Sequence, residues 1–297
     1  MSTAAHFDYS EAFGRQIGVL KEEEQHRLRA ATVALAGLGG AGGAQFVALL
    51  RLGVGRFHLA DPDRFELANF SRQLGALIDT VGRNKAEAMA EMGARVNPEV
   101  GMRVFPEGVN ATNLLDFLDG VDLVIDAIDF FAVAVRRLLM AECRRRGLTV
   151  VLASPVGFGA SVVVFPPAGD SFEEHFGLRD GMTRFEQLLA FALGVGYGLS
   201  EEVDLTRVDL SRATGPAVGT ACLLAAAMSA TEAVKLIARQ GPAPTGPYGV
   251  HFDPLRGRTV ALGKLPGLAD SPEGRALRDA FLRRMPGLGE LLEREPA

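Results

Sequence analysis

The chain has 297 residues, of which 48% are hydrophobic, and a formal net charge of −5. This size allows one large core, or one core with a smaller subdomain, and the acidic balance argues against nucleic acid as the main partner. Two cysteines, Cys143 and Cys222, are too few for a disulfide framework or a four-thiolate zinc site. The first residues contain no apolar segment flanked by positive charge, so we expect no secretory signal and a cytoplasmic protein.

The first half of the chain alternates between apolar runs and helical stretches. Residues 7–30 predict a helical entry segment with a charged face. Strands separated by crossover helices predict a doubly wound, mostly parallel sheet, and their continuous apolarity predicts burial on both faces. The predicted strands are 33–36, 57–60, 101–105, 123–127 and 150–153, and the predicted helices are 45–52, 84–97, 113–118 and 131–146.

The second half has a different character. A strand at 161–165 is followed by a region with acidic, aromatic and glycine residues, a small-residue helix at 217–238, and two short strands with hairpin spacing. The apolar run 216–230 is too short for a membrane span and predicts a buried helix. We expect an antiparallel C-terminal addition to the sheet and four parts: an N-terminal helical segment (1–30), a nucleotide-binding domain (31–165), a crossover region associated with substrate (166–262) and a tail (263–297).

A glycine-rich loop follows the first predicted strand. Gly37, Gly39 and Gly42 have the spacing G-x-G-x-x-G, and a helix follows them. In this context the backbone and the helix N-terminus receive phosphate groups. Asp61 ends the next strand, 19 residues after Gly42, where a carboxylate accepts hydrogen bonds from ribose. The pattern predicts a Rossmann-like nucleotide site but does not separate ATP, NAD and FAD.

Two cations and a pair of acids favour phosphate chemistry. Arg72 and Lys85 follow the ribose acid, and each alone is compatible with a surface charge. Together they suit neutralisation of a polyphosphate and of departing pyrophosphate, which a hydride-transfer enzyme does not need. Asp126 and Asp129 end a buried strand at the ligand-binding edge of the sheet. We interpret Asp129 as a Mg²⁺ ligand and Asp126 as structural, although the reverse stays open.

These motifs, in this order, resemble those of the ThiF/MoeB superfamily of ubiquitin-activating-type adenylyltransferases over about residues 9–240. The matching pieces are Gly14-Arg15-Gln16-Ile17, the run GLGGAGG at 37–43, Asp61-x-Asp63, Asn69-x-x-Arg72-Gln73, Gly82-x-x-Lys85 and Asp126-x-x-Asp129.

The resemblance implies that the chain binds ATP and Mg²⁺ and adenylates a carboxylate, usually the C-terminal glycine of a ubiquitin-like or sulfur-carrier protein. Arg15 resembles an arginine that reaches the active site of the other subunit, which implies a homodimer. The implied catalytic residues are Arg15, Arg72, Lys85 and Asp129, with Asp129 as the metal ligand. The implied nucleotide-binding residues are Gly37, Gly39, Gly40, Gly42, Asp61, Asp63, Asn69, Arg72, Gln73 and Lys85.

The chain also departs from the family pattern. It has no paired C-x-x-C motifs, so we expect no zinc, and Phe130 stands where the family commonly has asparagine. No cysteine falls within residues 166–213, where thioester-forming relatives carry theirs, so we expect adenylation without a cysteine thioester. Two alternatives stay open: adenylation of another substrate, such as a peptide or a modified tRNA base, and a non-catalytic binding protein of the same fold. The aromatic residues within 172–197 form either a docking surface or a subdomain core.

Overall fold

The computed structural model describes residues 6–210, 212–239, 245–268 and 271–284. The strands in this part of the chain are β1 (Thr32–Ala36), β2 (Arg56–Ala60), β3 (Gly101–Phe105), β4 (Leu123–Asp126), β5 (Val150–Val156), β6 (Gly159–Phe165), β7 (Tyr248–Asp253) and β8 (Arg258–Leu262). They form one sheet in the order β3-β2-β1-β4-β5-β6-β7-β8. Pairing is parallel from β3 to β5 and antiparallel from β5 to β8. The predicted fold class is confirmed.

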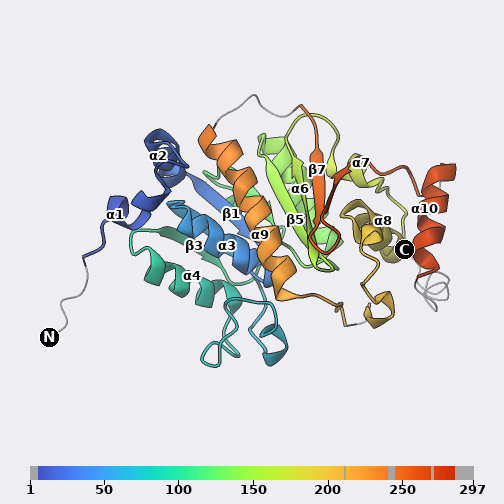
Figure 1. Cartoon of the computed structure of the whole chain (residues 1–297), viewed down its shortest axis with the longest axis horizontal. Helices are drawn as coiled ribbons and strands as arrows, with labels where there is room; N and C mark the ends of the chain where they lie inside the picture. The colour runs from blue at the N-terminus through green and yellow to red at the C-terminus, as the bar shows by residue number, and fades with distance from the viewer. Residues whose placement is uncertain (1–5, 211, 240–244, 269–270, 285–297) are drawn as a thin grey trace.

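Helices cover both faces of this sheet, and α1 and α10 lie at the two ends of the molecule (Figure 1). The helices in the described part of the chain follow in chain order. They are α1 (Tyr9–Phe13), α2 (Glu22–Ala30), α3 (Gly40–Arg51), α4 (Lys85–Val96), α5 (Leu114–Phe117), α6 (Val133–Arg146), α7 (Phe172–Phe176), α8 (Arg184–Gly194), α9 (Gly219–Ala233) and α10 (Pro272–Leu282). Short 3₁₀ turns are η1 (Gly14–Gln16), η2 (Leu67–Asn69), η3 (Tyr197–Leu199) and η4 (Leu205–Arg207), and a π-helical segment, η5 (Val234–Arg239), continues α9.

The alternation of side chains along the strands divides the core into two layers. Val33 and Leu35 of β1 pack into the cluster beneath α3, α4 and α9, whereas Ala34 and Ala36 pack into the cluster beneath α5 and α6. Successive residues of a strand point to opposite faces, so a strand covered on both faces has to be apolar throughout. All five residues of β1 are buried, which explains the continuous apolar run in the sequence.

Two predicted elements differ from the structure. The entry segment is not one helix, because the chain turns at Gly18, which has a φ of +109°, between η1 and α2. The helix after the glycine loop begins at Gly40 rather than residue 45, so the last glycines of the motif form its first turn. A helix that begins within the loop points its free N–H groups towards the cavity described below.

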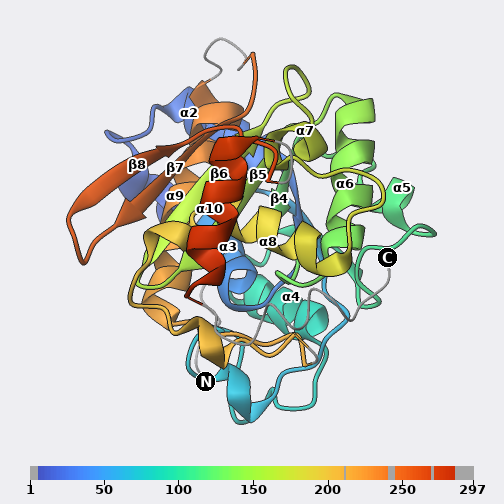
Figure 2. The same ribbon diagram turned by 90° about the vertical axis from the view of Figure 1, so that its right-hand side faces the viewer.

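The region after β6 folds as an apolar subdomain. Its helices α7 and α8 begin with capping boxes at Ser171 and Thr183 and pack against α6 and the end of the sheet, as Figure 2 shows. Phe172, Phe176 and Phe191 are buried and form part of a core, which is one of the two interpretations given above. Phe185, Phe191 and Tyr197 also line the cavity described below. One continuous sheet includes strands of both the predicted nucleotide-binding domain (31–165) and the predicted crossover region (166–262). The boundary between these two parts stays a prediction.

Helix α9 together with η5 is the one candidate for a membrane span among the described residues. Gly219–Arg239 is long and apolar enough to cross a membrane by length and composition, but half of its most apolar window is buried inside the protein. Ala225 and Ala233 are fully buried in the cluster that α3 and the sheet share. Small side chains allow this close packing, which is what a core helix requires.

Candidate functional site

The carboxyl ends of β1, β2 and β4 open into one cavity of about 740 Å³. Most of the residues singled out in the sequence line it: Gly37, Gly39, Gly40, Asp61, Asp63, Asn69, Arg72, Gln73, Lys85 and Asp129. Two do not. Gly42 packs against the carbonyl of Gly37 in the loop, and Arg15 lies exposed on η1, outside the cavity lining. The volume of the cavity is within the range of pockets that hold small ligands and cofactors.

Asp61 fixes the glycine loop to the end of β2. Its carboxylate accepts hydrogen bonds from the N–H of Leu38 at 2.6 Å and from the N–H of Asp63 at 2.9 Å. Burial raises the pKa of Asp61, while the charge of Lys85 and these backbone donors lower it. The carboxylate therefore holds the loop in place, and Asp61 also lines the cavity. Each carboxylate oxygen has more than one lone pair, so Asp61 can accept a further hydrogen bond.

Gly39 is the point where the loop leaves room for a ligand. A Cβ placed there meets only the Gln73 amide, at 3.7 Å, so the backbone is open on the cavity side. Gln73 is buried, and its Oε1 has no hydrogen-bond partner among the described residues. An unpartnered buried amide next to an open backbone is a polar site that a bound group satisfies.

Lys85 is a buried cation at the start of α4. Its Nζ lies 2.9 Å from Oδ2 of Asp63, and the exposed fractions of the two side chains are 7% and 65%. The neighbouring Asn84 caps the helix and donates to the carbonyl of Asp61 at 3.0 Å. Lys85 is thus held in place. The exposed carboxylate of Asp63 can instead bind water when the Lys85 ammonium binds another anion. A buried ammonium facing a cavity is suited to bind an anion there.

Arg72 and Asn69 come from the segment after β2. Asn69 is buried, and its side chain accepts a hydrogen bond from the N–H of Glu66, which fixes the η2 turn. The half-buried Arg72 donates one hydrogen bond to the carbonyl of Ala68 at 3.0 Å. A guanidinium carries five N–H donors, so Arg72 retains donors for an anion in the cavity.

The two acids after β4 have different environments. Oδ2 of Asp126 lies 2.8 Å from Nε of Arg136, and both side chains are almost completely buried. Burial raises the pKa of Asp126, and the charge of Arg136 opposes that shift. Asp129 is exposed to the cavity, and one of its oxygens accepts from the N–H of Phe131 at 2.9 Å. Asp126 is therefore committed to an ion pair, whereas Asp129 is free to meet a ligand.

Sequence reasoning missed Arg136. Its guanidinium also donates to the carbonyl oxygens of Ile128 and Asp129 and lies 4.3 Å from the ring centroid of Phe191. It therefore orders the backbone that carries Asp129. The sequence held no signal for this contact, because Arg136 precedes further arginines on α6 and looks like a charged helix face.

Neither cysteine has the surroundings of a nucleophile. Both are buried. Burial raises the pKa of the Cys143 thiol, and it raises the pKa of Cys222 to about 11 although the charge of Arg72 opposes the shift. A reactive thiol needs the opposite, a lowered pKa and exposure. Cys222 does line the cavity, beside Gly40, and the sequence alone did not place it there.

A magnesium ligand set is only partly present in the protein. The described residues contain no group of three or more acidic, histidine or cysteine side chains that could hold a metal ion. Mg²⁺ is usually bound by one or two carboxylates together with phosphate oxygens and water. Asp129, a single cavity-facing carboxylate, fits that mode and not a metal site built of protein groups alone.

The chain is similar in sequence to several known proteins. The sequence model of the ThiF family matches residues 13–265. The chain is 34% identical over 151 residues to the tRNA threonylcarbamoyladenosine dehydratase of Haemophilus influenzae, covering 50% of this chain and 57% of that protein. It is 29% identical over 143 residues to the sulfur carrier protein ThiS adenylyltransferase of Escherichia coli, covering 48% and 56%. The chain thus spans little more than half the length of these curated relatives.

A solved structure gives a similar result over more of the chain. The Escherichia coli tRNA N6-threonylcarbamoyladenosine dehydratase in complex with ATP superposes with a TM-score of 0.58 and 25% sequence identity. The superposition covers 78% of this chain and 97% of that one. The shared part is therefore longer than the predicted nucleotide-binding domain (31–165).

Proposed function

Because the chain belongs to the ThiF family, we propose that it is an ATP-dependent adenylyltransferase that activates a carboxylate in the 740 Å³ cavity. The observation that carries the proposal is the gathering of Lys85, Arg72 and Asp129 around the glycine loop in one cavity. Two cations and one free carboxylate beside a phosphate-binding backbone suit a nucleoside triphosphate better than a dinucleotide.

In the proposed reaction, a carboxylate oxygen attacks the α-phosphorus of ATP. The bond from that phosphorus to the bridging oxygen of the β-phosphate breaks, and pyrophosphate leaves with the bonding electrons. Asp61 would hold the ribose, and the backbone at Gly39 the phosphates. Lys85 and Arg72 would stabilise the charge that develops on the phosphate oxygens. Asp129 would hold Mg²⁺, which neutralises phosphate charge when bound. Positioning and electrostatics supply the catalysis, and no covalent enzyme intermediate is needed.

The first candidate substrate is the C-terminal glycine of a ubiquitin-like or sulfur-carrier protein, as in the ThiS adenylyltransferase relative. The buried thiols favour adenylation without a cysteine thioester. The dehydratase relatives keep a modified tRNA base as an alternative, although the net charge of −5 gives no basic footprint for tRNA. A pseudoenzyme that only binds a partner is the remaining alternative. We place the reaction in the cytoplasm.

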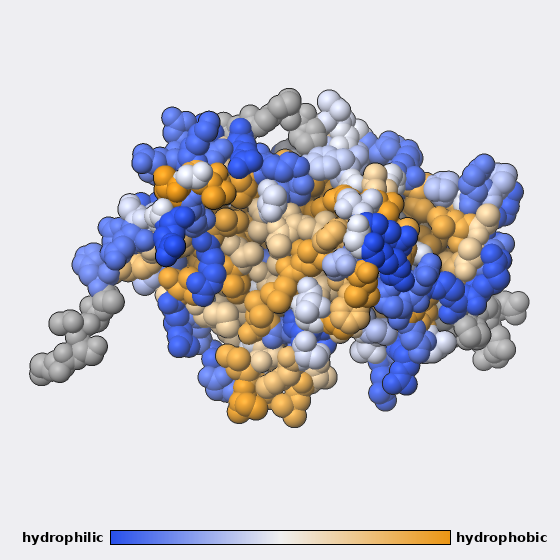
Figure 3. Space-filling view, in the orientation of Figure 1, coloured by the Kyte–Doolittle hydropathy of each residue, from blue (hydrophilic) through white to orange (hydrophobic). Residues whose placement is uncertain are grey.

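We further propose that the active unit is a homodimer. Arg15 lies outside the cavity of its own chain, so it acts only if a second copy presents it. The segment after β2 exposes apolar side chains, including Ile78 at 79% and Leu67 at 68%, and Figure 3 shows an apolar protrusion at the lower margin of this face. Others in this patch are Phe70, Leu74, Leu77 and Val81. Such patches commonly mark interfaces.

A complementation experiment tests the dimer. Arg15→Ala and Asp129→Ala subunits, each inactive alone, are mixed after separate purification. If Arg15 acts across the interface, mixed dimers contain one intact site and regain part of the activity. A mixture as inactive as its components, with mixed dimers present by mass, contradicts the shared site.

Nucleotide binding tests the site itself. Calorimetry with ATP and Mg²⁺ is expected to give saturable binding that Lys85→Met weakens about tenfold or more, because a hydrogen bond to a charged group is lost. Lys264→Met is the matched control, since Lys264 also pairs with an aspartate, at 3.1 Å, but does not line the cavity. The absence of ATP binding at millimolar nucleotide by folded protein contradicts the proposal.

A further inference from the structure

Part of the cavity lining is apolar and is not used by the nucleotide chemistry, and we take this part as a second end of the cavity. Its polar lining comes from the ends of β1, β2 and β4 and from the start of α4, whereas the apolar lining comes from α8, η3 and the residues after Asp129. We call this end the acyl chamber and define it by Phe130, Phe185, Leu188, Leu189, Phe191 and Tyr197. The chamber is continuous with the space around the glycine loop.

The chamber begins directly at Asp129. The next residue, Phe130, packs its ring 5.3 Å from that of Phe191 and 5.5 Å from that of Tyr197, measured between centroids. The wall is therefore an aromatic layer that begins next to Asp129, the residue whose carboxylate is proposed to face the phosphates. A substrate group that leaves the reacting carboxylate in this direction enters apolar surroundings at once.

Tyr197 contributes the polar atom in this wall. Its hydroxyl makes no hydrogen bond to another described residue, and burial together with the nearby Cys222 and Asp129 raises its pKa to about 12. The phenol is therefore neutral and able to donate. A neutral donor beside an apolar wall is suited to a carboxylate or carbonyl oxygen at the mouth of the chamber.

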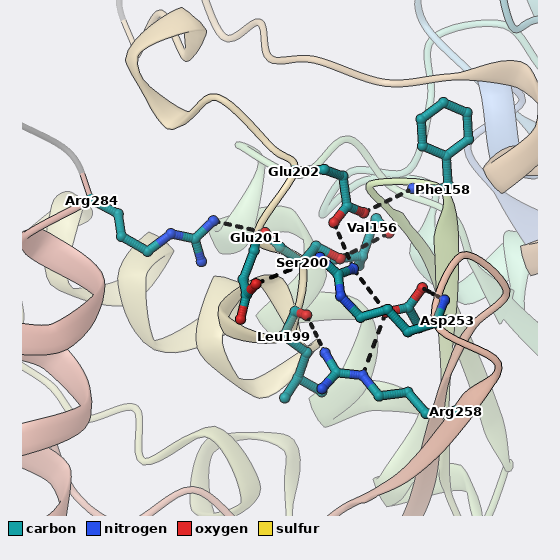
Figure 4. A network of polar contacts seen from close by, with 10 residues as sticks. Val156, Phe158, Leu199, Ser200, Glu201, Glu202, Asp253, Arg258 and Arg284 are labelled. Atoms are coloured by element: carbon teal, nitrogen blue, oxygen red, sulfur yellow. Dashed lines mark hydrogen bonds and ion pairs between the residues drawn. The ribbon is translucent and has the colours of Figure 1, made fainter.

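The Tyr197 turn is held by a network of polar contacts (Figure 4). Arg258 donates to the carbonyl of Leu199 at 2.6 Å, and Arg284 donates to the carbonyl of Ser200 at 2.7 Å. Ser200 in turn donates to the carbonyl of Val156 on β5. These contacts fix Leu199, the last residue of η3, and Ser200, which follows it, to the sheet and to the segment after α10. They therefore hold the backbone of the turn that carries Tyr197.

We propose that the acyl chamber receives a bulky apolar group attached to the reacting carboxylate, with the Tyr197 hydroxyl donating a hydrogen bond to its oxygen. The inference rests on the proposed adenylation but not on the terminal-glycine substrate named first above, which it replaces with another class of carboxylate. A terminal glycine has no side chain and leaves the chamber unfilled, whereas each buried methylene group strengthens binding about fourfold. The favoured substrate is therefore a carboxylate with an aliphatic or aromatic neighbour.

Stable mimics of acyl-adenylates test this directly. Sulfamoyl adenosine and its N-acetyl, N-glycyl, N-isovaleryl and N-phenylacetyl derivatives are titrated into the full chain by calorimetry. We expect the isovaleryl and phenylacetyl compounds to bind about tenfold or more tightly than the acetyl and glycyl compounds. Equal affinities, or tightest binding of the glycyl compound, overturn the inference and leave adenylation standing. Failure of every compound and of ATP to bind overturns the proposed function as well.

Two variants locate the effect. Ala192→Phe fills the chamber from α8, where Ala192 is buried in the lining, and is expected to abolish the preference while plain sulfamoyl adenosine binds as before. Ala276→Phe, on an exposed position of α10, is the control. Tyr197→Phe keeps the ring and loses the donor, so acyl compounds are expected to weaken about two- to tenfold. An undiminished preference in folded Ala192→Phe, or unchanged affinities in Tyr197→Phe, contradicts the assignment.

Discussion

The substitution Gly42→Ala tests how the glycine loop is built. A Cβ at Gly42 lies 2.0 Å from the carbonyl oxygen of Gly37, and ordinary contact begins at about 3.4 Å. The helix and the loop therefore have to separate by about 1.4 Å, the difference between those two distances. The obstacle is backbone, and Gly37 is fixed on its other side by a hydrogen bond from its N–H to the carbonyl of Ala60 at 2.8 Å.

The cost follows from two opposing effects. Overpacking costs about 1–3 kcal/mol, and a backbone obstacle at 2.0 Å places Gly42→Ala in the upper part of that range, at about 2–3 kcal/mol. The better helix propensity of alanine offsets about 1 kcal/mol. We expect a net loss of about 1–2 kcal/mol in the free energy of unfolding, a decrease in Tm of roughly 2–8 °C, and at least about tenfold weaker ATP binding because the loop moves. Thermal unfolding and calorimetry measure both quantities.

Gly14→Ala is the control for this substitution. A Cβ at Gly14 meets nothing within 4 Å, so the variant is expected to keep both Tm and ATP affinity. If Gly42→Ala also retains the wild-type Tm and ATP affinity, the close contact between helix and loop does not determine the shape of the site, and the reasoning is wrong.

Three further predictions concern Asp129, the buried pair of Arg136 and Asp126, and His58. Asp129→Asn keeps an acceptor for the N–H of Phe131, so we expect an unchanged Tm. Mg²⁺-dependent activity is expected to fall about tenfold or more. Unchanged activity excludes Asp129 as the metal ligand. Arg136→Ala leaves Asp126 buried without its partner, so we expect it to lower the free energy of unfolding in urea titrations by about 3–5 kcal/mol. The control, Arg145→Ala at an exposed position, is expected to lower it by about 1 kcal/mol or less. Equal losses in the two variants contradict the account of the buried pair. Burial lowers the pKa of His58, so its contribution to stability is complete above its unfolded pKa of about 6.5 and is lost as pH falls through the folded value. Stability measured from pH 7.5 to pH 5 is expected to decline less in His58→Gln, and an identical decline shows that His58 is not responsible.

Local patterns predicted the parallel half of the fold well. Strands such as β1 are buried on both faces, so their apolar runs are continuous and easily recognised. The glycine spacing and the acid at Asp61 likewise lie within one β-α-β unit, where local order determines geometry. Boundaries were less accurate: α3 begins at Gly40 because the glycine-rich stretch forms the first turn of the helix itself.

The helices of the crossover region were missed although a signal existed. Ser171 with Glu174, and Thr183 with Glu186, form capping boxes, and this spacing is visible in the sequence. The role of Arg136 had no such signal, because its partner Asp126 lies on a different element and only the packing of α6 brings them together. The acyl chamber was hidden for the same reason: its wall combines Phe130 with residues more than 50 positions away.

Pyrophosphate exchange tests the central claim most directly. The full chain is incubated with ATP, Mg²⁺ and [³²P]pyrophosphate, with and without carboxylates that carry glycine or a bulky apolar neighbour. Reversible adenylation predicts label entering ATP only when a carboxylate is present, and loss of that label in Lys85→Met. Two results contradict the claim for protein that binds ATP: label that enters ATP equally without any carboxylate, and no label in ATP with either the glycine or the bulky apolar carboxylates. In either case the chain does not activate these carboxylates in this cavity.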